Sequence, residues 1–233
     1  MGLGHSPRIV TDGLVLCLDA ANKRSYGGSG TTWTDRSTSG RNGTLSNTPT
    51  FNDEDISYFS FDGSNDFVGL GDELVNLFTD KVTVCAWFKT TVTPPASAHI
   101  LAQSQSTSTT NYITLFVYSD GKVYFQIRNS SGTPNAKSSE VVTDGVWRYA
   151  VGVSSGSTNN RLYLNGELES ESSVNLIYGG VIPDSTRIGC WIRNNASESN
   201  FFNGDIGLVK AYNRALTADE IRQNYLATKE RYA

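Results

Sequence analysis

The stretch Tyr112–Arg128 reads YITLFVYSDGKVYFQIR, two runs rich in aromatic and β-branched residues on either side of an Asp-Gly pair at Asp120. A glycine after an aspartate supplies the positive φ of a tight turn between antiparallel strands. The stretch therefore predicts a β-hairpin. RLYLNGELES (Arg161–Ser170) predicts a second hairpin, with an Asn-Gly pair at the turn.

Further strands are predicted on both sides of these hairpins. In VTVCAWFKTT (Val82–Thr91) alternate residues form two faces, and both faces carry bulky side chains, which is typical of a strand inside a sandwich. The other predicted strands are LVLCLDA (Leu14–Ala20), two short strands in YFSFDGSNDFVGLG (Tyr58–Gly71), WRYAVGVSS (Trp147–Ser155), STRIGCWIR (Ser185–Arg193) and FNGDIGLVKAYNR (Phe202–Arg214).

One helix is predicted, near the C-terminus, where Thr217 and Glu220 form a capping box. Long polar loops are expected at 25–50, 91–111, 129–143 and 194–200, and loops of this kind often carry binding sites. Strands of one kind run from residue 14 to 214. We therefore expect one domain over residues 1–233, with an N-terminal arm at 1–12 and a C-terminal helix and tail at 216–233.

The composition excludes several classes of protein. Ser, Thr and Asn number 27, 23 and 19 among 233 residues, which is not the composition of a coiled coil or helical bundle. Lys and Arg number 19 against 23 Asp and Glu, so the chain lacks the basic excess of a nucleic-acid-binding protein. With 4 Trp, 11 Tyr and 10 Phe, the chain has the material for a large core.

The sequence also allows predictions about secretion, membrane insertion and the redox state of the cysteines. The N-terminus lacks an apolar segment after a basic one, and no run of about 18 apolar residues occurs, so we expect neither a secretion signal nor a membrane span. Cys17, Cys85 and Cys190 are odd in number and widely spaced, which predicts three buried reduced thiols.

Several of these segments, in their order along the chain, resemble a known family. LVLCLDAANKRSY, FDGSNDFV, RLYLNGEL and NGDIGLVKAYNRALTADEI are similar to the laminin-G-like branch of the concanavalin A-like lectin/glucanase superfamily, over roughly residues 8–226. The resemblance implies an all-β fold: a jelly-roll β-sandwich of two antiparallel sheets, one of them curved, with a short C-terminal helix.

The N-terminal segment LVLCLDAANKRSYGGSGTTWTDRSTSGRNGTL resembles stand-alone domains of phage and marine-virus structural proteins. This resemblance implies a virion component assembled in the cytoplasm of a bacterial host. Its expected partners are other virion proteins of the capsid or tail, its expected state in that assembly is oligomeric, and a host surface glycan is a further expected partner.

Little in the chain points to catalysis. His5 lies in the N-terminal tail and His99 in a predicted Pro/Ser/Ala loop, where we expect ordinary exposed side chains. A glycosidase needs two carboxylates on either side of the scissile bond. Glu167, Glu169 and Glu171 alternate, but they follow a hairpin turn among serines and are expected to form a solvated arm. We therefore expect no catalytic residue.

Two kinds of binding site are predicted. Asp62, Asn65 and Asp66 bring three oxygen-bearing side chains to one turn, with Asp205 as a possible fourth, which suits the oxygen ligands of Ca²⁺. The alternative is that these residues cap their own turn. The family resemblance also implies calcium at the sandwich rim, although Gly207 and Leu208 replace acids found in many relatives. No cofactor is expected to be required.

A glycan site needs an aromatic face for the apolar side of a sugar ring and planar polar groups for its hydroxyls. The sequence offers two sets of such residues, and each set is equally suited to packing at the rim. The first set is Trp191, Arg193, Asn194 and Asn195, and the second is Tyr26, Trp33 and Asp35.

Three functional hypotheses remain. The favoured one is a non-enzymatic structural or decoration protein of a bacteriophage virion (capsid surface, fibre or tail), whose lectin-like sandwich contacts host glycans. The alternative is a carbohydrate-binding lectin-like domain that is not tied to a virion. A glycan hydrolase is the least favoured.

Overall fold

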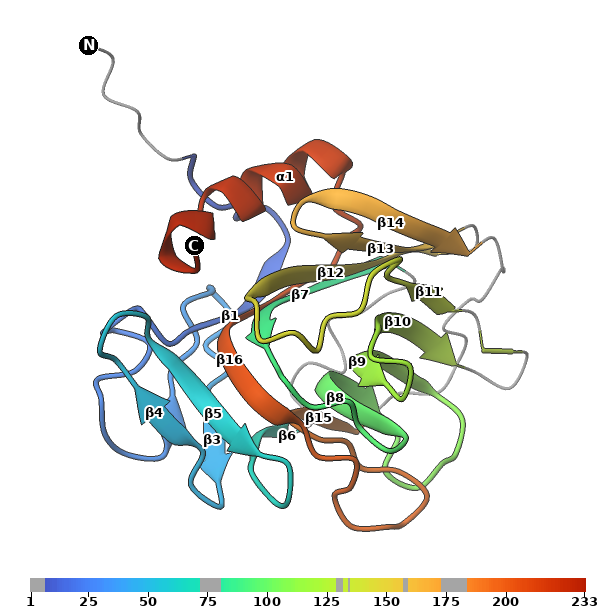
Figure 1. The fold of residues 1–233 in the computed structure, drawn as a ribbon, viewed down its shortest axis with the longest axis horizontal. Coiled ribbons are helices and arrows are strands. Elements are labelled where there is room, and N and C mark those ends of the chain that lie inside the picture. Colours follow the sequence, from blue (N-terminus) through green and yellow to red (C-terminus); the bar gives the residue numbers. More distant parts are fainter. Residues whose placement is uncertain (1–6, 72–80, 129–131, 134, 157–158, 173–183) are drawn as a thin grey trace.

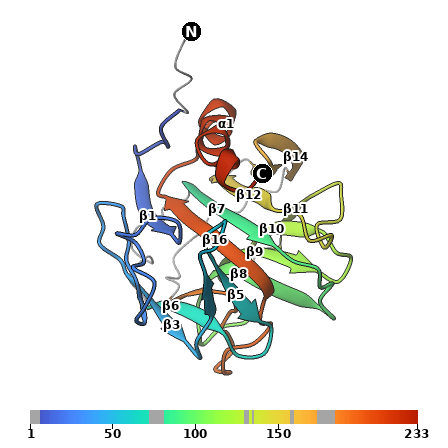
Figure 2. The same ribbon diagram turned by 60° about the vertical axis from the view of Figure 1, so that its left-hand side comes forward.

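A computed structural model describes residues 7–71, 81–128, 132–133, 135–156, 159–172 and 184–233. Within them the strands form two eight-stranded antiparallel sheets packed face to face (Figures 1 and 2). The first sheet runs in the order β14 (Glu167–Ser172), β13 (Asn160–Leu164), β12 (Arg148–Ser155), β7 (Lys81–Lys89), β16 (Asn203–Tyr212), β5 (Tyr58–Asp62) and β4 (Thr50–Asn52), with β1 (Leu14–Asp19) also paired to β16.

The second sheet runs in the order β11 (Asn135–Lys137), β10 (Val123–Arg128), β9 (Tyr112–Tyr118), β8 (Ser97–Ser104), β15 (Ser185–Ile188), β6 (Phe67–Gly71), β3 (Gly43–Ser46) and β2 (Thr32–Trp33). Both predicted hairpins are present, as β9–β10 and β13–β14. The predicted fold class is confirmed: a concanavalin A-like β-sandwich of two antiparallel sheets with a short C-terminal helix.

The central strands of the first sheet, β12, β7 and β16, are buried on both faces, as the alternation in β7 predicts. Val84 and Phe88 belong to the core between the two sheets, whereas Cys85 and Trp87 belong to a second apolar layer on the outer face. The second layer is closed by the C-terminal helix and tail through Ile221 and by other residues from both ends of the chain. Helix α1 (Ala218–Leu226) accordingly lies across the first sheet in Figure 1.

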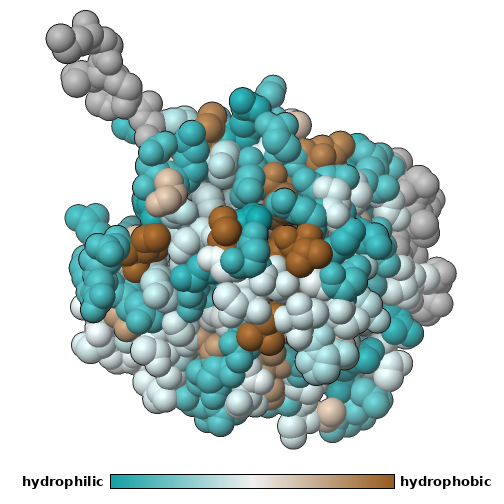
Figure 3. All heavy atoms as spheres, in the orientation of Figure 1, coloured by the Kyte–Doolittle hydropathy of each residue, from teal (hydrophilic) through white to brown (hydrophobic). Residues whose placement is uncertain are grey.

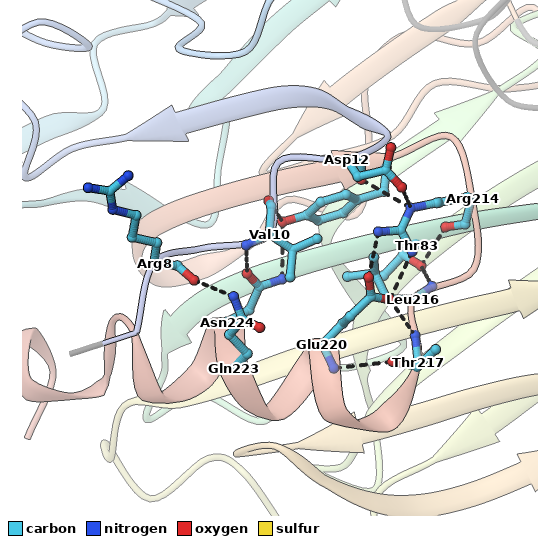
Figure 4. Close-up of polar contacts among 11 residues, drawn as sticks. Arg8, Val10, Asp12, Thr83, Arg214, Leu216, Thr217, Glu220, Gln223 and Asn224 are labelled. Atoms are coloured by element: carbon cyan, nitrogen blue, oxygen red, sulfur yellow. Dashed lines mark hydrogen bonds and ion pairs between the residues drawn. The ribbon is translucent and has the colours of Figure 1, made fainter. Parts of the chain in front are cut away.

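Hydrogen bonds tie helix α1 to the N-terminal segment (Figure 4). The buried Asn224 accepts a bond from the backbone N–H of Val10 (2.8 Å) and donates one to the Tyr212 hydroxyl (3.0 Å). The predicted capping box of Thr217 and Glu220 is present at the start of the helix. Of the predicted N-terminal arm, residues 1–6 with His5 lie outside the described residues.

Three of the predicted loops contain strands. The segment 91–111, expected to be a loop, holds β8, while 25–50 holds β2 and β3, and 129–143 holds β11. His99 is therefore not an exposed loop residue: it lies in β8 and is only 2% exposed. The alternation in β8 is hard to see in the sequence because a bulge between His99 and Leu101 shifts the register. Of its two alanines, Ala98 faces the core and Ala102 packs on the outer face, so neither marks a face by its size.

The three cysteines are free and buried, as predicted. On the face shown in Figure 3, apolar residues form small separate patches on a polar surface. No helix among the described residues has the length and apolarity to cross a membrane.

Candidate functional site: an aromatic groove

The outer face of the second sheet holds a groove of about 570 Å³ over β8, β9 and β10. We call this feature the aromatic groove because six of its side chains carry aromatic rings, the imidazole of His99 included. It is lined by Ala96, Ser97, His99, Tyr112, Phe116, Tyr118, Tyr124, Gln126, Arg128, Thr133, Asn135, Trp191, Arg193 and Asn200.

The hairpin β9–β10 supplies the floor of the groove through simple strand alternation. Residues i and i+2 of a strand share a face, so Tyr112, Phe116 and Tyr118 of β9 point outward. The alternate residues Ile113, Leu115 and Val117 enter the core. The same period in β10 brings Tyr124 opposite Phe116 and Arg128 opposite Tyr112. The hairpin thus has one apolar core face and one face of aromatic and polar side chains.

An aromatic row crosses the strands beneath the groove. Tyr124 stacks on Phe116 with ring centres 5.4 Å apart, and Phe116 stacks on His99 at 5.3 Å. His99 in turn stacks on Trp191 at 4.2 Å, with 16° between the ring planes. Four rings from four segments therefore form a continuous stacked floor, which holds each ring in one orientation.

Hydrogen bonds fix the imidazole of His99 in one tautomer. Thr114 donates its only hydroxyl proton to the carbonyl of Leu101 (3.1 Å), so Nδ1 of His99, 2.7 Å away, is the donor to Thr114 Oγ1. Nε2 is then an acceptor from Ser97 Oγ (3.3 Å), which itself accepts a bond from Asn200 Nδ2 (2.6 Å).

Burial, with a smaller contribution from the positive charge of Arg193, lowers the pKa of His99 to about 3. His99 is therefore neutral at physiological pH and has both ring nitrogens satisfied. Its arrangement supports a role in positioning the aromatic row. The same arrangement does not suit a general base, which would need an imidazole that accepts and releases a proton near neutral pH.

The first predicted glycan set is divided by the structure. Trp191 and Arg193 line the groove, and the Arg193 guanidinium lies 4.1 Å from the centre of the indole ring. Trp191 is only 7% exposed, so its ring packs more than it faces solvent. Asn194 and Asn195 are exposed turn residues with φ of 60° and 55°, and they do not line the groove.

The second predicted glycan set lies within the sandwich. Trp33 is fully buried and Tyr26 is 6% exposed, and both pack on Phe59 in the core between the sheets. Asp35 accepts bonds from the backbone N–H groups of Cys17 and two loop residues, and so fixes the first loop. These side chains have packing and capping roles here.

The three aspartates of the predicted calcium set have carboxylate oxygens engaged within the protein. Asp62 Oδ1 accepts backbone bonds from Ser64 (2.8 Å) and Asn65 (3.2 Å), and these bonds lower its pKa. Burial raises the pKa of Asp66. Asp205 forms an ion pair with Lys89 at 3.0 Å. Among the described residues no three His, Cys, Asp or Glu side chains gather as a metal site. Calcium binding here stays a prediction.

The alternating glutamates lie on the exposed strand β14, as expected. Glu167 pairs with Arg222 (2.6 Å), and Glu171 pairs with Arg161 (2.9 Å). Glu169 accepts bonds from the backbone and side chain of Ser139. Each carboxylate thus has its own partner, and none of the three lines the aromatic groove.

Sequence reasoning missed most of the groove. The β9–β10 hairpin was predicted, but its outward residues Phe116, Tyr118, Tyr124 and Arg128 were not named as a site. The available signal was their spacing, because aromatic residues that recur every second position on the same face of both strands must meet across the hairpin.

Comparison with solved structures shows the same fold in binding domains. Domain 4 of AbnA, a GH43 extracellular arabinanase from Geobacillus stearothermophilus, in complex with arabinotriose, matches with a TM-score of 0.71 and 18% identity, over 94% of this chain and 100% of the domain. A structure of botulinum neurotoxin type C, described as dependent on two ganglioside molecules for cell entry, matches with a TM-score of 0.69 and 16% identity.

The chain spans about half of that toxin structure, since the match covers 93% of this chain and 52% of the toxin chain. The binding domain of botulinum neurotoxin DC in complex with rat synaptotagmin II matches with a TM-score of 0.67 and 14% identity, over 93% and 52% of the two chains. No curated protein matches the chain in sequence.

The sequence assigns the chain to one family. The family model described as the concanavalin A-like lectin/glucanases superfamily matches residues 62–222, which include both β-hairpins and the start of helix α1. The fold is thus lectin-like, of a kind that carries carbohydrate-binding domains, and the chain belongs to the concanavalin A-like lectin/glucanase superfamily.

Proposed function

We propose that this protein is a non-catalytic glycan-binding domain, and that it holds a saccharide in the aromatic groove. The observation that carries the proposal is the stacked row of Tyr124, Phe116, His99 and Trp191 beneath a groove of about 570 Å³. A volume of this order is typical of small-molecule sites, which combine apolar walls with a few placed polar groups.

A sugar ring has an apolar face and polar hydroxyl groups, and the groove has side chains that suit both. Tyr118 is 44% exposed and stands edge-on to Tyr124, so it offers an open aromatic ring to the apolar face of a pyranose. Gln126 and Asn135, on neighbouring strands, provide amide groups for hydroxyls. The Gln126 carbonyl oxygen accepts a bond from the Tyr112 hydroxyl (2.8 Å), which leaves the amide N–H groups for a ligand.

The structural neighbours support the same function. The arabinanase domain was solved with arabinotriose, and the neurotoxin structure concerns ganglioside interaction. At 16% to 18% identity these likenesses concern the fold, and the groove residues of this chain carry the argument for binding.

The lining of the groove also supports binding without hydrolysis. Glycoside hydrolysis commonly uses two Asp or Glu side chains, about 5 to 9.5 Å apart, on either side of the scissile bond. The described lining of the groove contains neither Asp nor Glu. A saccharide in this groove would meet aromatic rings, amides and arginines.

Glycan-array screening followed by calorimetric titration of the best saccharide tests this proposal. The test variant is Tyr118→Ala, and the control is Leu168→Ala, which removes a 52% exposed side chain from β14 in the other sheet. We expect wild type and Leu168→Ala to bind equally, and Tyr118→Ala to lose at least about tenfold in affinity, or about 1.4 kcal/mol. Unchanged affinity in Tyr118→Ala contradicts the aromatic groove as the binding site. If wild type binds no saccharide on the array, glycan binding itself is contradicted.

The place on a bacteriophage virion stays a prediction from the sequence resemblance, as do virion partners and an oligomeric assembly. A virion component would be present in purified particles at a copy number that matches a symmetric position. Quantitative mass spectrometry of particles checks this, and absence from particles contradicts it.

A further inference from the structure

We infer that the aromatic groove selects acidic saccharides, and that Arg128 and Arg193 hold the carboxylate of the sugar at one end of the groove. This inference rests on the proposed function and names the ligand class of the same site. It follows from three observations: the positions of the two arginines, the absence of carboxylate partners for them among the described residues, and the absence of acidic side chains from the described lining of the groove.

Both arginines lie at the Tyr112 end of the groove. Arg128 is the last residue of β10 and pairs across the hairpin with Tyr112. The Tyr112 ring meets the Trp191 ring edge-on at 5.4 Å, and the Arg193 guanidinium covers the same indole at 4.1 Å. The two cations therefore come from different segments, β10 and the loop after Trp191, and converge on one end of the aromatic row.

Neither guanidinium is neutralised by the described residues. Arg193 makes one hydrogen bond, from Nη1 to the carbonyl of Thr109 at 3.3 Å, and Arg128 has no hydrogen bond or ion pair with the described chain. Three other partly buried arginines do form ion pairs: Arg148, Arg187 and Arg214 each pair with a carboxylate. Within the described part of the chain, the Arg128 guanidinium and all but one of the donors of Arg193 thus have no hydrogen-bond partner.

The two positive charges also act on each other. Burial lowers the pKa of Arg193, and the nearby charge of Arg128 lowers it as well. Like charges held together in a partly buried site raise the free energy of the empty protein. A bound carboxylate removes this repulsion and forms bidentate bonds with a planar guanidinium fork.

The rest of the groove does not compensate this charge. His99 is neutral, and the described lining has no acidic side chain. The nearest carboxylate partner of a lining residue is Asp120, which accepts a bond from the Tyr124 hydroxyl (2.9 Å) near the opposite end of β9. Tyr112 and Tyr118 are six residues apart in β9, or about 20 Å at about 3.4 Å per residue. A sugar chain therefore meets the two arginines at one end of the groove and Tyr118 and Tyr124 at the other, where Lys137 Nζ lies 5.6 Å from the centre of the Tyr124 ring.

Matched pairs of saccharides test this inference. We suggest uronic acid oligosaccharides with their methyl esters, and sialylated oligosaccharides with their desialylated counterparts, titrated at two salt concentrations. We expect the acidic member of at least one pair to bind at least tenfold more tightly than its neutral partner, and this preference to shrink as salt rises.

Variants identify the residues responsible. Arg128→Gln and Arg193→Gln should each reduce the ratio of acidic to neutral affinity at least fivefold, while Arg193→Lys, which keeps the charge but loses the fork, should give an intermediate ratio. Arg222→Gln, a 60% exposed side chain paired with Glu167 on the other sheet, is the control and should leave the ratio unchanged. Thermal unfolding confirms that each variant is folded.

The outcomes separate this inference from the proposed function. Equal or stronger binding of the neutral member in every pair overturns the acidic preference and leaves glycan binding intact. A preference that survives in Arg128→Gln and Arg193→Gln overturns the assignment of the arginines. If wild type binds neither member of any pair, both the proposed function and the inference are overturned.

Discussion

The Nζ atom of Lys210 lies 5.5 Å from the centre of the Tyr149 ring, and neither residue is exposed to solvent. Lys210 stands on β16 between Cys17 of β1 and Cys85 of β7. Its ammonium group has no hydrogen-bond partner in the described structure. Burial lowers the pKa of Lys210, and it outweighs Cys85, Cys17 and Asp19, which act in the opposite direction.

Lys210→Met should therefore raise the free energy of unfolding at pH 7, by about 1 kcal/mol, because an apolar side chain of similar length replaces an unpaired buried amine. Urea denaturation measures the change. Lys23→Met, at a side chain that is 70% exposed, is the control and should have little effect. A loss of stability in Lys210→Met contradicts this prediction.

The same residue predicts a pH effect of defined sign. The folded pKa of Lys210 is lowered below 10.5, so between the folded and unfolded pKa values the unfolded chain binds the extra proton. Between these two pKa values, the contribution of Lys210 to the free energy of unfolding therefore rises with pH. The difference between wild type and Lys210→Met should shrink as pH rises toward 10, while the effects of the tyrosines and cysteines are common to both proteins.

Much of the fold was predictable because its signals are local. The turns at Asp120-Gly121 and Asn165-Gly166 place glycines at φ of 73° and 86°, where the sequence pattern required a positive value. The capping box at Thr217 marks the helix start for the same reason. Strand β8 was missed because its register depends on a bulge at His99, which only pairing with β9 and β15 defines.

The candidate site was predictable only in part. Trp191 and Arg193 were chosen for their chemistry, and they line the groove. Trp33 has the same chemistry but is fully buried, because burial depends on which sheet faces cover the ring. The row from Tyr124 to Trp191 joins four segments, and no single segment of the sequence contains that juxtaposition.

Asn224→Ala should destabilise the protein by about 2 to 4 kcal/mol, because it removes a buried amide and leaves the Val10 N–H without its acceptor. The measurement is denaturant unfolding. Gln223→Ala is a matched control on the preceding residue, since Gln223 is partly exposed and its side chain donates to the carbonyl of Arg8 (2.6 Å). Equal losses in the two variants contradict the anchoring role of Asn224.

His99 should stay neutral in the folded protein well below pH 6. Its folded pKa is about 3 against an ordinary value of 6.5, so the unfolded chain binds a proton first as pH falls. Stability should therefore decline by about 1.4 kcal/mol per pH unit from this group between pH 6.5 and about 3. NMR of the imidazole resonances checks this: titration of His99 near pH 6.5 in the folded protein contradicts it, and the denatured chain supplies the reference.

Glu220 predicts a second loss of stability in acid, over a lower pH range than the loss that His99 causes. Its carboxylate accepts bonds from Arg214 at 2.6 and 2.8 Å and from the Thr217 N–H at 2.9 Å, and these partners lower its pKa from 4.5 to about 2. Because the folded pKa is depressed, this contribution to stability is complete above pH 4.5 and is lost as pH falls through about 2.

Glu220→Gln should accordingly be less stable than wild type at pH 7, and the gap should close as pH falls from 4.5 to 2. Chemical denaturation at a series of pH values measures the gap. Glu230→Gln, at a side chain that is 72% exposed, is the control and should follow the wild-type profile. A gap of constant size down to pH 2 would place the role of Glu220 in its hydrogen bonds alone, and would contradict the ionic contribution of the pair with Arg214.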